Sequence, residues 1–184
     1  EASDPKGRRW QGRAADAAAA HPNLAFDSEG VAGQAPHLQG REGGNSRLRS
    51  GGVLILDSSA IVSLLTEEVG HEGVVRRASA APLLAVGAPT LVETCMVLSA
   101  RLGKDPRPVL YEFLREMNVE VIPFTTEHYE VAVDAFERFG KGRHPAALNF
   151  GDCLTYAVAR LSGLPLLYTG EDFARTDLAS WSGP

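Results

Sequence analysis

Apolar side chains are distributed so unevenly along this chain that only its later part can form a folded core. Residues 1–52 contain five Val, Ile, Leu, Met or Phe residues and nine of the 19 glycines, whereas residues 53–184 contain 43 such apolar residues. A segment with so little apolar surface to bury does not offset the entropy that it loses on ordering. We therefore expect residues 1–52 to be a disordered or non-native N-terminal extension and residues 53–184 to form one folded domain.

The two ends of this extension suggest where it comes from. The chain begins with Glu1 rather than methionine, and an apolar segment starts abruptly at Val53 after Gly51-Gly52. The valine codon GTG can start translation, and a ribosome-binding sequence read in frame encodes glycines. We therefore hypothesise that the natural protein starts near Val53; a native peptide from residues 1–50 would disprove this. The pair Arg8-Arg9 precedes no apolar stretch, which argues against a secretion signal.

Composition excludes several classes of protein. No apolar run approaches the ~20 residues that span a bilayer, so we expect no membrane segment and a cytoplasmic location. Two cysteines are too few for a disulfide scaffold. The net charge of −5 argues against a protein that holds nucleic acid by bulk charge alone. A local basic rim around an acidic site remains compatible with that charge.

Apolar strand-like runs alternate with helical patterns through residues 53–184. Continuous apolar runs are typical of strands that are buried on both faces, and we predict four of them, at residues 53–56, 83–86, 119–123 and 164–168. Helical spacing and end signals predict one helix capped by Ser58 or Ser59, one capped by Thr126, and others that begin at residues 71, 89, 105 and 151. Gly103, Gly140 and Gly163 are expected to end three of these helices. The alternation predicts an α/β fold, with a central parallel sheet between two layers of helices.

Four acidic residues fall where such a sheet places its ligand site, beyond the carboxyl ends of the strands. Asp57 ends the first strand, and Asp172 follows the last strand after a short turn. Asp152 is expected in the first turn of its helix, and Glu93 in the first turn of another helix among apolar neighbours. Each acid alone has an ordinary explanation as a turn, cap or helix-dipole residue, so it is their joint placement that favours a site.

The chemistry of these side chains points to a divalent cation. Carboxylates held close together repel one another, and some of them must take up protons unless a cation neutralises them. Carboxylate oxygens without histidine or cysteine at ligand spacing favour Mg²⁺ or Mn²⁺ over zinc. Such a metal can activate water and neutralise charge on a phosphoryl group. The residues therefore predict hydrolysis of a phosphodiester or of another phosphate ester.

Four ordered motifs resemble the signatures of PIN-domain ribonucleases, and most closely those of the VapC toxins of bacterial toxin–antitoxin pairs. They are LILDSSA at 54–60, LVET at 91–94, LNFGDC at 148–153 and LYTGEDF at 167–173. The resemblance covers essentially all of residues 53–184 and none of residues 1–52. It implies a PIN-like three-layer α/β sandwich and a Mg²⁺-dependent endoribonuclease, with Mn²⁺ as a possible substitute, that arrests translation by cutting a structured RNA such as tRNA or rRNA.

The resemblance also implies roles for single residues. Asp57 and Asp152 would be direct metal ligands, Asp172 would hold a metal or its waters, and Glu93 would act through water. Ser59 matches a hydroxyl near the metal, and Asn149 belongs to the motif that carries Asp152.

The loop that leads into Asn149 carries three basic side chains, Lys141, Arg143 and His144. It resembles the same region in one VapC subgroup, and these side chains could contact RNA phosphates. The plainer interpretation is a solvated loop.

The implied partners are an RNA substrate, a second copy of the chain in a homodimer, and a cognate VapB-like antitoxin that blocks the acidic site. Three alternatives stay open at this point. A haloacid-dehalogenase-type phosphatase requires a second aspartate two residues after the first. This chain has Ser58-Ser59 after Asp57, which argues against that class. A receiver domain requires a pair of neighbouring acids early in the chain and a lysine after the last strand. Residues 165–172 contain no lysine. The third is a non-catalytic PIN-like domain that binds RNA or a partner.

Overall fold

The computed structural model describes residues 52–67 and 71–178. Apart from Gly52, the predicted N-terminal extension lies outside the described residues. Within them, no helix is long and apolar enough to pass through a membrane.

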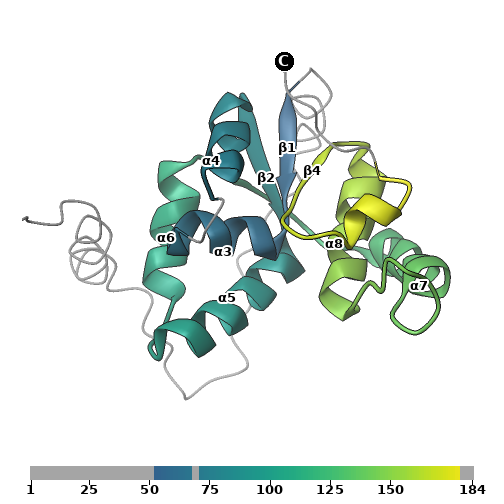
Figure 1. Cartoon of the computed structure of the whole chain (residues 1–184). Helices are drawn as coiled ribbons and strands as arrows, with labels where there is room; N and C mark the ends of the chain where they lie inside the picture. The colour runs from purple at the N-terminus through teal and green to yellow at the C-terminus, as the bar shows by residue number, and fades with distance from the viewer. Residues whose placement is uncertain (1–51, 68–70, 179–184) are drawn as a thin grey trace, which may run out of the picture. The chain divides into compact units, whose positions relative to one another are not determined.

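A four-stranded parallel sheet forms the centre of the fold, as predicted (Figure 1). The strands are β1 (Val53–Leu56), β2 (Leu83–Gly87), β3 (Glu120–Ile122) and β4 (Leu166–Leu167), in the order β3-β2-β1-β4. β4 is shorter than the predicted strand at 164–168, since only Leu166 and Leu167 pair with β1, opposite Ile55 and Leu56. Beyond the strand pairing, the backbone N–H of Asp57 still donates to the carbonyl of Leu167 at 3.0 Å.

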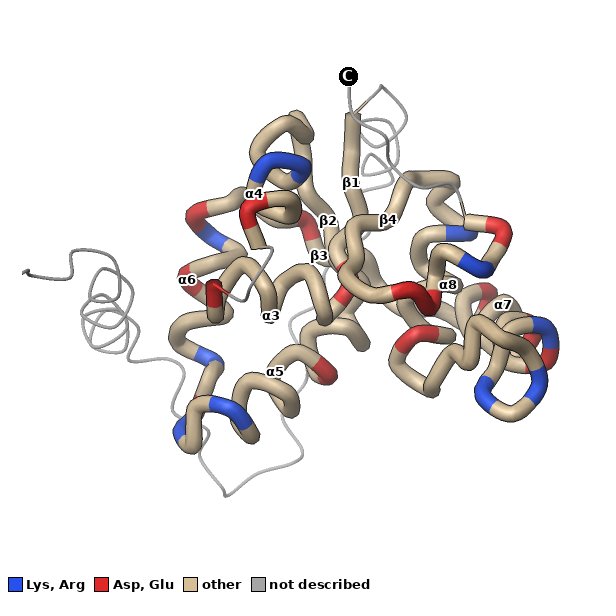
Figure 2. The backbone as a smooth tube through the Cα atoms, in the orientation of Figure 1, with Lys and Arg blue, Asp and Glu red and all other residues tan. Residues whose placement is uncertain are grey.

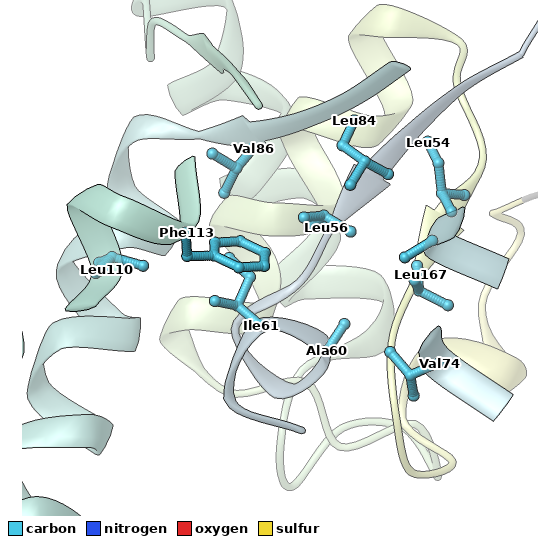
Figure 3. Packing of buried hydrophobic residues seen from close by; sticks show 11 residues of the cluster. Leu54, Leu56, Ala60, Ile61, Val74, Leu84, Val86, Leu110, Phe113 and Leu167 are labelled. Atoms are coloured by element: carbon cyan, nitrogen blue, oxygen red, sulfur yellow. The ribbon is translucent and has the colours of Figure 1, made fainter. Parts of the chain in front are cut away.

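Helices cover both faces of this sheet. On one face, α3 (Ser58–Thr66), α4 (His71–Ala80) and α6 (Arg107–Glu116) pack against apolar side chains of the strands (Figure 3). That core cluster contains Leu54, Leu56, Ala60, Ile61, Val74, Ala78, Leu84, Val86, Leu110, Phe113 and Leu167. It uses alternate residues of β1 and β2, as the two-residue period of a strand requires.

The opposite face is covered by α8 (Phe150–Ser162), against which α7 (Thr126–Phe139) packs. Ile55 and Ala85 are fully buried on this side. A Cβ added at Gly87 would lie 2.9 Å from Cγ2 of Val158, which shows how closely β2 approaches α8. The remaining helix, α5 (Ala88–Leu102), follows β2 directly and contacts both α3 and α8. The predicted three-layer α/β sandwich is therefore confirmed.

The helix ends agree with several predicted signals and correct three others. Gly103 and Gly163 adopt left-handed backbone conformations, with φ of 62° and 65°, and end α5 and α8 as predicted. The N-cap of α3 is Asp57 rather than a serine, and the N-cap of α7 is Thr125, one residue before the predicted one. Glu93 is the sixth residue of α5, so its predicted place in the first turn of that helix is wrong.

Candidate active site

The sheet topology brings the segments that carry the predicted acids to one edge. β1 lies between β2 and β4, and Asp57 follows β1 directly. Because the strands are parallel, α5 begins at the same edge after β2, and the turn toward Asp172 leaves β4 there. Figure 2 shows acidic segments of the chain between α5 and α8, beside the ends of β1 and β4.

Asp57 is the most deeply buried of the four acids, at 3% exposure. Its Oδ2 accepts hydrogen bonds from the backbone N–H of Ser59, at 3.0 Å, and from the Ser59 hydroxyl. Its Oδ1 is buried and has no hydrogen-bond partner. Burial raises the pKa of Asp57, and the bonds from Ser59 only partly oppose this effect. One oxygen is thus fixed by the helix cap, and the other is left available.

Ser59 links Asp57 to the loop after β4. The Ser59 hydroxyl donates to Asp57 and accepts a hydrogen bond from the backbone N–H of Thr169, at 3.0 Å. The Ser59 hydroxyl, which was predicted as a supporting group, therefore connects the end of β1 with the segment that leads to Asp172.

Glu93 reaches the same place from α5 by packing against a glycine. A Cβ added at Gly151 would lie 2.3 Å from Oε2 of Glu93 and 2.4 Å from its Oε1, so the carboxylate occupies the space that any larger residue would need. Oε2 of Glu93 is buried without a hydrogen-bond partner. The pKa of Glu93 is raised, first by burial and then by the negative charges of Asp57 and Asp152.

Asp152 is held by the start of α8. Its backbone N–H donates to Oδ1 of Asn149 at 3.0 Å, and its Oδ2 accepts from the backbone N–H of Asn149 at 2.7 Å. This reciprocal capping box gives Asn149, predicted as a supporting residue, a definite positioning role. Burial raises the pKa of Asp152 to about 6, with smaller contributions from the charges of Asp57 and Asp172.

Asp172 joins the group from the exposed side. It immediately precedes a short 3₁₀ turn, η2 (Phe173–Arg175). Phe173 is 3% exposed, and its ring lies 5.2 Å from that of Tyr168 between ring centres. The segment that carries Asp172 is thus anchored by a buried aromatic side chain next to it.

The loop after α7 carries the three predicted basic residues, and its lysine and arginine segments lie apart from the acidic segments beside β1 and β4 (Figure 2). In Figure 2 the basic segments of this loop lie beyond the end of α7. Arg143 pairs with Glu137, with 2.8 Å between Nη1 and Oε2, and His144 accepts from the backbone N–H of Ala146 at 3.1 Å. Lys141 is exposed. Two of the three side chains therefore already have structural partners within the protein.

The donor set fits a hard divalent cation. Carboxylate oxygens from three elements converge, and two of these oxygens, Oδ1 of Asp57 and Oε2 of Glu93, are buried without partners. Such oxygens are costly to leave unpaired and are favourable ligands for a cation. Within residues 52–67 and 71–178, no three acidic, histidine or cysteine side chains are yet close enough to enclose an ion. The side chains would have to close further around it.

Two residues at this site were not predicted from the sequence. Gly151 admits the Glu93 carboxylate, and its one signal is a glycine near the start of a helix, where it is a poor helix former. Thr155 lies one turn after Asp152, and its hydroxyl lowers the pKa of Asp57 slightly against the larger effect of burial. It also lies 2.9 Å from the hydroxyl of Thr90, a buried contact between α8 and α5.

The folded domain is similar in sequence to known proteins. A family model described as "PIN domain" matches residues 54–178. Ribonuclease VapC36 of Mycobacterium tuberculosis is 46% identical over 126 residues, which cover 68% of this chain and 91% of that protein. Ribonuclease VapC30 of the same species is 34% identical over 131 residues, which cover 71% of this chain and all of that protein.

Solved structures show the same fold. The crystal structure of M. tuberculosis VapC20, described as a sarcin-ricin loop cleaving toxin, matches with a TM-score of 0.57 at 20% identity, over 71% of this chain and 99% of that one. VapBC2 from Rickettsia felis, bound to a DNA fragment from its promoter, matches with a TM-score of 0.54 at 14% identity, over the same shares of the two chains.

Proposed function

This chain belongs to the PIN-domain family and is a ribonuclease toxin of the VapC type, and from that premise we propose that it is a Mg²⁺-dependent endoribonuclease that hydrolyses RNA phosphodiester bonds. One observation carries the metal dependence: Asp57, Glu93 and Asp152 converge with two buried, unpartnered carboxylate oxygens. A cluster of this kind is unfavourable without a cation.

Asp57, Asp152 and Asp172 would hold the metal, Glu93 would contact it through water, and Mn²⁺ could replace Mg²⁺. The metal would supply a more acidic bound water and neutralise charge on the phosphate. The protein's own residues fix the geometry. Ser59 orients Asp57 through its hydrogen bonds, and the Asn149 capping box orients Asp152.

The proposed substrate is a structured RNA, tRNA or rRNA, whose cleavage in the cytoplasm arrests translation. The description of VapC20 as a sarcin-ricin loop cleaving toxin supports this class of target. Lys141, Arg143 and His144 would contact the RNA backbone at a distance from the acids. Arg143 would have to exchange its pairing with Glu137 for a phosphate, so Lys141 is the cation freest to do so.

Two protein partners belong to the proposal. Solved relatives that are toxin–antitoxin complexes support a VapB-like antitoxin, whose basic side chain would pair with the unmetallated acids. A homodimer is supported by exposed apolar side chains on α5 and α7, namely Val92, Met96, Tyr129, Val133 and Phe136.

We further propose that residues 53–184 form the whole nuclease domain and that residues 1–52 are dispensable for cleavage. The match of the family model, which begins at residue 54, supports this division.

Mapping cleavage sites tests the function directly. The full chain is incubated with total bacterial RNA and Mg²⁺, and new 5′ ends are compared with those made by Asp57→Asn. Asp134→Asn on α7 makes the same change of charge at an exposed position and serves as the control. Discrete ends that are lost with Asp57→Asn and with EDTA, and kept with Asp134→Asn, are expected. Identical maps from all variants would favour the alternative, a non-catalytic PIN-like domain that binds RNA or a partner.

A further inference from the structure

The side chain of Phe150 is more exposed than any other large apolar side chain in the described part of the chain. It is 80% exposed, against 69% for Met96 and 62% for Val92. It is also the first residue of α8, directly before the glycine that receives Glu93 and two residues before Asp152. An aromatic ring therefore stands in solvent beside the candidate active site.

The start of α8 does not need this ring for its own stability. Asn149 caps the helix through its side chain, and Asp152 completes the capping box. The apolar pair that often clamps a helix start lies one residue before the cap and four residues into the helix. Those positions are Leu148 and Cys153, and both are buried. Phe150 takes no part in either device, so its exposure has no structural explanation at this helix end.

We propose that Phe150 stacks on a nucleobase of the RNA next to the phosphodiester bond that is cut. This inference rests on the proposed function. Every nucleobase presents an aromatic face, and stacking on an exposed aromatic side chain is the usual way in which proteins hold unpaired bases. Phe150 and Asp152 both lie in the first turn of α8, so an RNA strand with a phosphate at the acids would pass beside the residue that carries the ring.

The surroundings favour an RNA base over an apolar protein surface. Asp152, Asp172 and the exposed Asn149 lie around this end of α8, so a protein that covered Phe150 would also have to cover charged and polar groups. The exposed apolar side chains on α5 and α7 offer a second copy of the chain a larger surface. Once the carboxylates hold a divalent cation, a single ring beside them suits a ligand that is part aromatic and part anionic.

Fluorescence reports stacking without relying on cleavage. Phe150→Trp is made in the full chain together with Asp57→Asn, to prevent cutting, and with Trp10→Phe and Trp181→Phe, which remove the two native tryptophans. Total bacterial tRNA and rRNA should quench the fluorescence of the new indole, whereas inorganic polyphosphate, a polyanion without bases, should not. Equal responses to both probes would overturn the stacking.

Affinity measurements separate the aromatic face from simple hydrophobicity. In the Asp57→Asn background, Phe150→Ala and Phe150→Leu should both weaken the binding of fluorescently labelled bacterial tRNA and rRNA. The expected loss is about 5- to 150-fold, since stacking contributes about 1–3 kcal/mol per base. Tyr111→Leu on α6, which removes another exposed ring, should leave RNA affinity unchanged. Unchanged affinity with Phe150→Leu would overturn the stacking alone.

Two further outcomes distinguish a failure of the proposed function from a role of Phe150 in the dimer. An unsubstituted full chain that neither binds nor cuts RNA in Mg²⁺ would overturn the proposed function, and the stacking with it. A fall in molecular mass with Phe150→Ala, measured by sedimentation, with no loss of RNA affinity would instead place Phe150 between two copies of the chain.

Discussion

The contact between Glu93 and Gly151 predicts a substitution that separates stability from activity. In Gly151→Ala, the new Cβ would lie 2.3–2.4 Å from the three atoms of the Glu93 carboxyl group, whereas ordinary contacts begin at 3.4 Å. The carboxylate must therefore move by roughly 1 Å, and misplacement on that scale can lower a catalytic rate by about 100-fold. Because the clashing atoms are the far end of a flexible side chain, the fold itself can absorb this shift.

The stability of the same variant should stay equal or rise. Alanine favours a helix interior over glycine by as much as about 1 kcal/mol, and less near a helix end. Gly73→Ala in α4 is the matched control, since nothing lies within 4 Å of the added Cβ. It should gain similar stability and keep full activity.

Urea denaturation and cleavage of an RNA from the 5′-end map give the two measurements. Adding Glu93→Asp to Gly151→Ala shortens the acid and should recover part of the lost activity. Full activity of Gly151→Ala on its own would refute the reasoning, because it would show that the position of Glu93 against α8 is not required.

Three further predictions concern the groups around the acids. The pKa of Asp152 is about 6 in the folded protein against an ordinary 3.8, so the unfolded chain loses this proton first as pH rises. Without metal, in EDTA, the free energy of unfolding should therefore fall between about pH 4 and pH 6. Asp152→Asn should reduce that fall, measured by urea titration at each pH. Tyr156→Phe removes a 2.6 Å hydrogen bond to Asp177 and should lower the free energy of unfolding by about 1.5 kcal/mol. Glu137→Gln, which removes an exposed ion pair with Arg143, should change it by less than about 1 kcal/mol. Equal effects of the two substitutions would contradict this difference between a buried and an exposed partner. Ser59→Ala removes the hydroxyl that joins Asp57 to the loop after β4. It should lower kcat/KM about tenfold with little change in KM, as expected of about 1.4 kcal/mol of lost positioning; a change confined to KM would argue against that role.

The architecture followed from the sequence because its signals are local and strong. The apolar run at 53–56 predicted β1 at its observed bounds, and Gly103 and Gly163 end their helices in the left-handed conformation that glycine favours. The predicted N-cap of α3 was wrong for a physical reason. Aspartate and serine are equally good caps, and only the path of the backbone decides that Asp57 reaches the N–H of Ser59.

The candidate site was predictable to the extent that it depends on topology. Asp57 lies at the end of a central strand, and the rule that ligands bind beyond the carboxyl ends of parallel strands was sufficient to nominate it. Gly151 and Thr155 were missed because their roles exist only where α5 and α8 meet. No spacing along the chain encodes that approach. Glu93 was placed one turn too early for a local reason: α5 begins at Ala88, before the predicted start at residue 89, so Glu93 is its sixth residue.

The site is built from local devices that each fix one acid and leave it partly unsatisfied. A helix cap holds Asp57, a glycine admits Glu93 and a capping box holds Asp152, yet burial raises the pKa of all three. Within residues 52–67 and 71–178, no lysine or arginine acts on the pKa of these three acids, so a positive group that enters the cluster would meet unpaired negative charge. A metal ion and a basic side chain of an antitoxin would relieve the same repulsion at the same oxygens. On the proposed mechanism the two compete for the cluster, so the binding of either would weaken the other by an equal factor. The arrangement that favours catalysis would then also give an inhibitor its binding place.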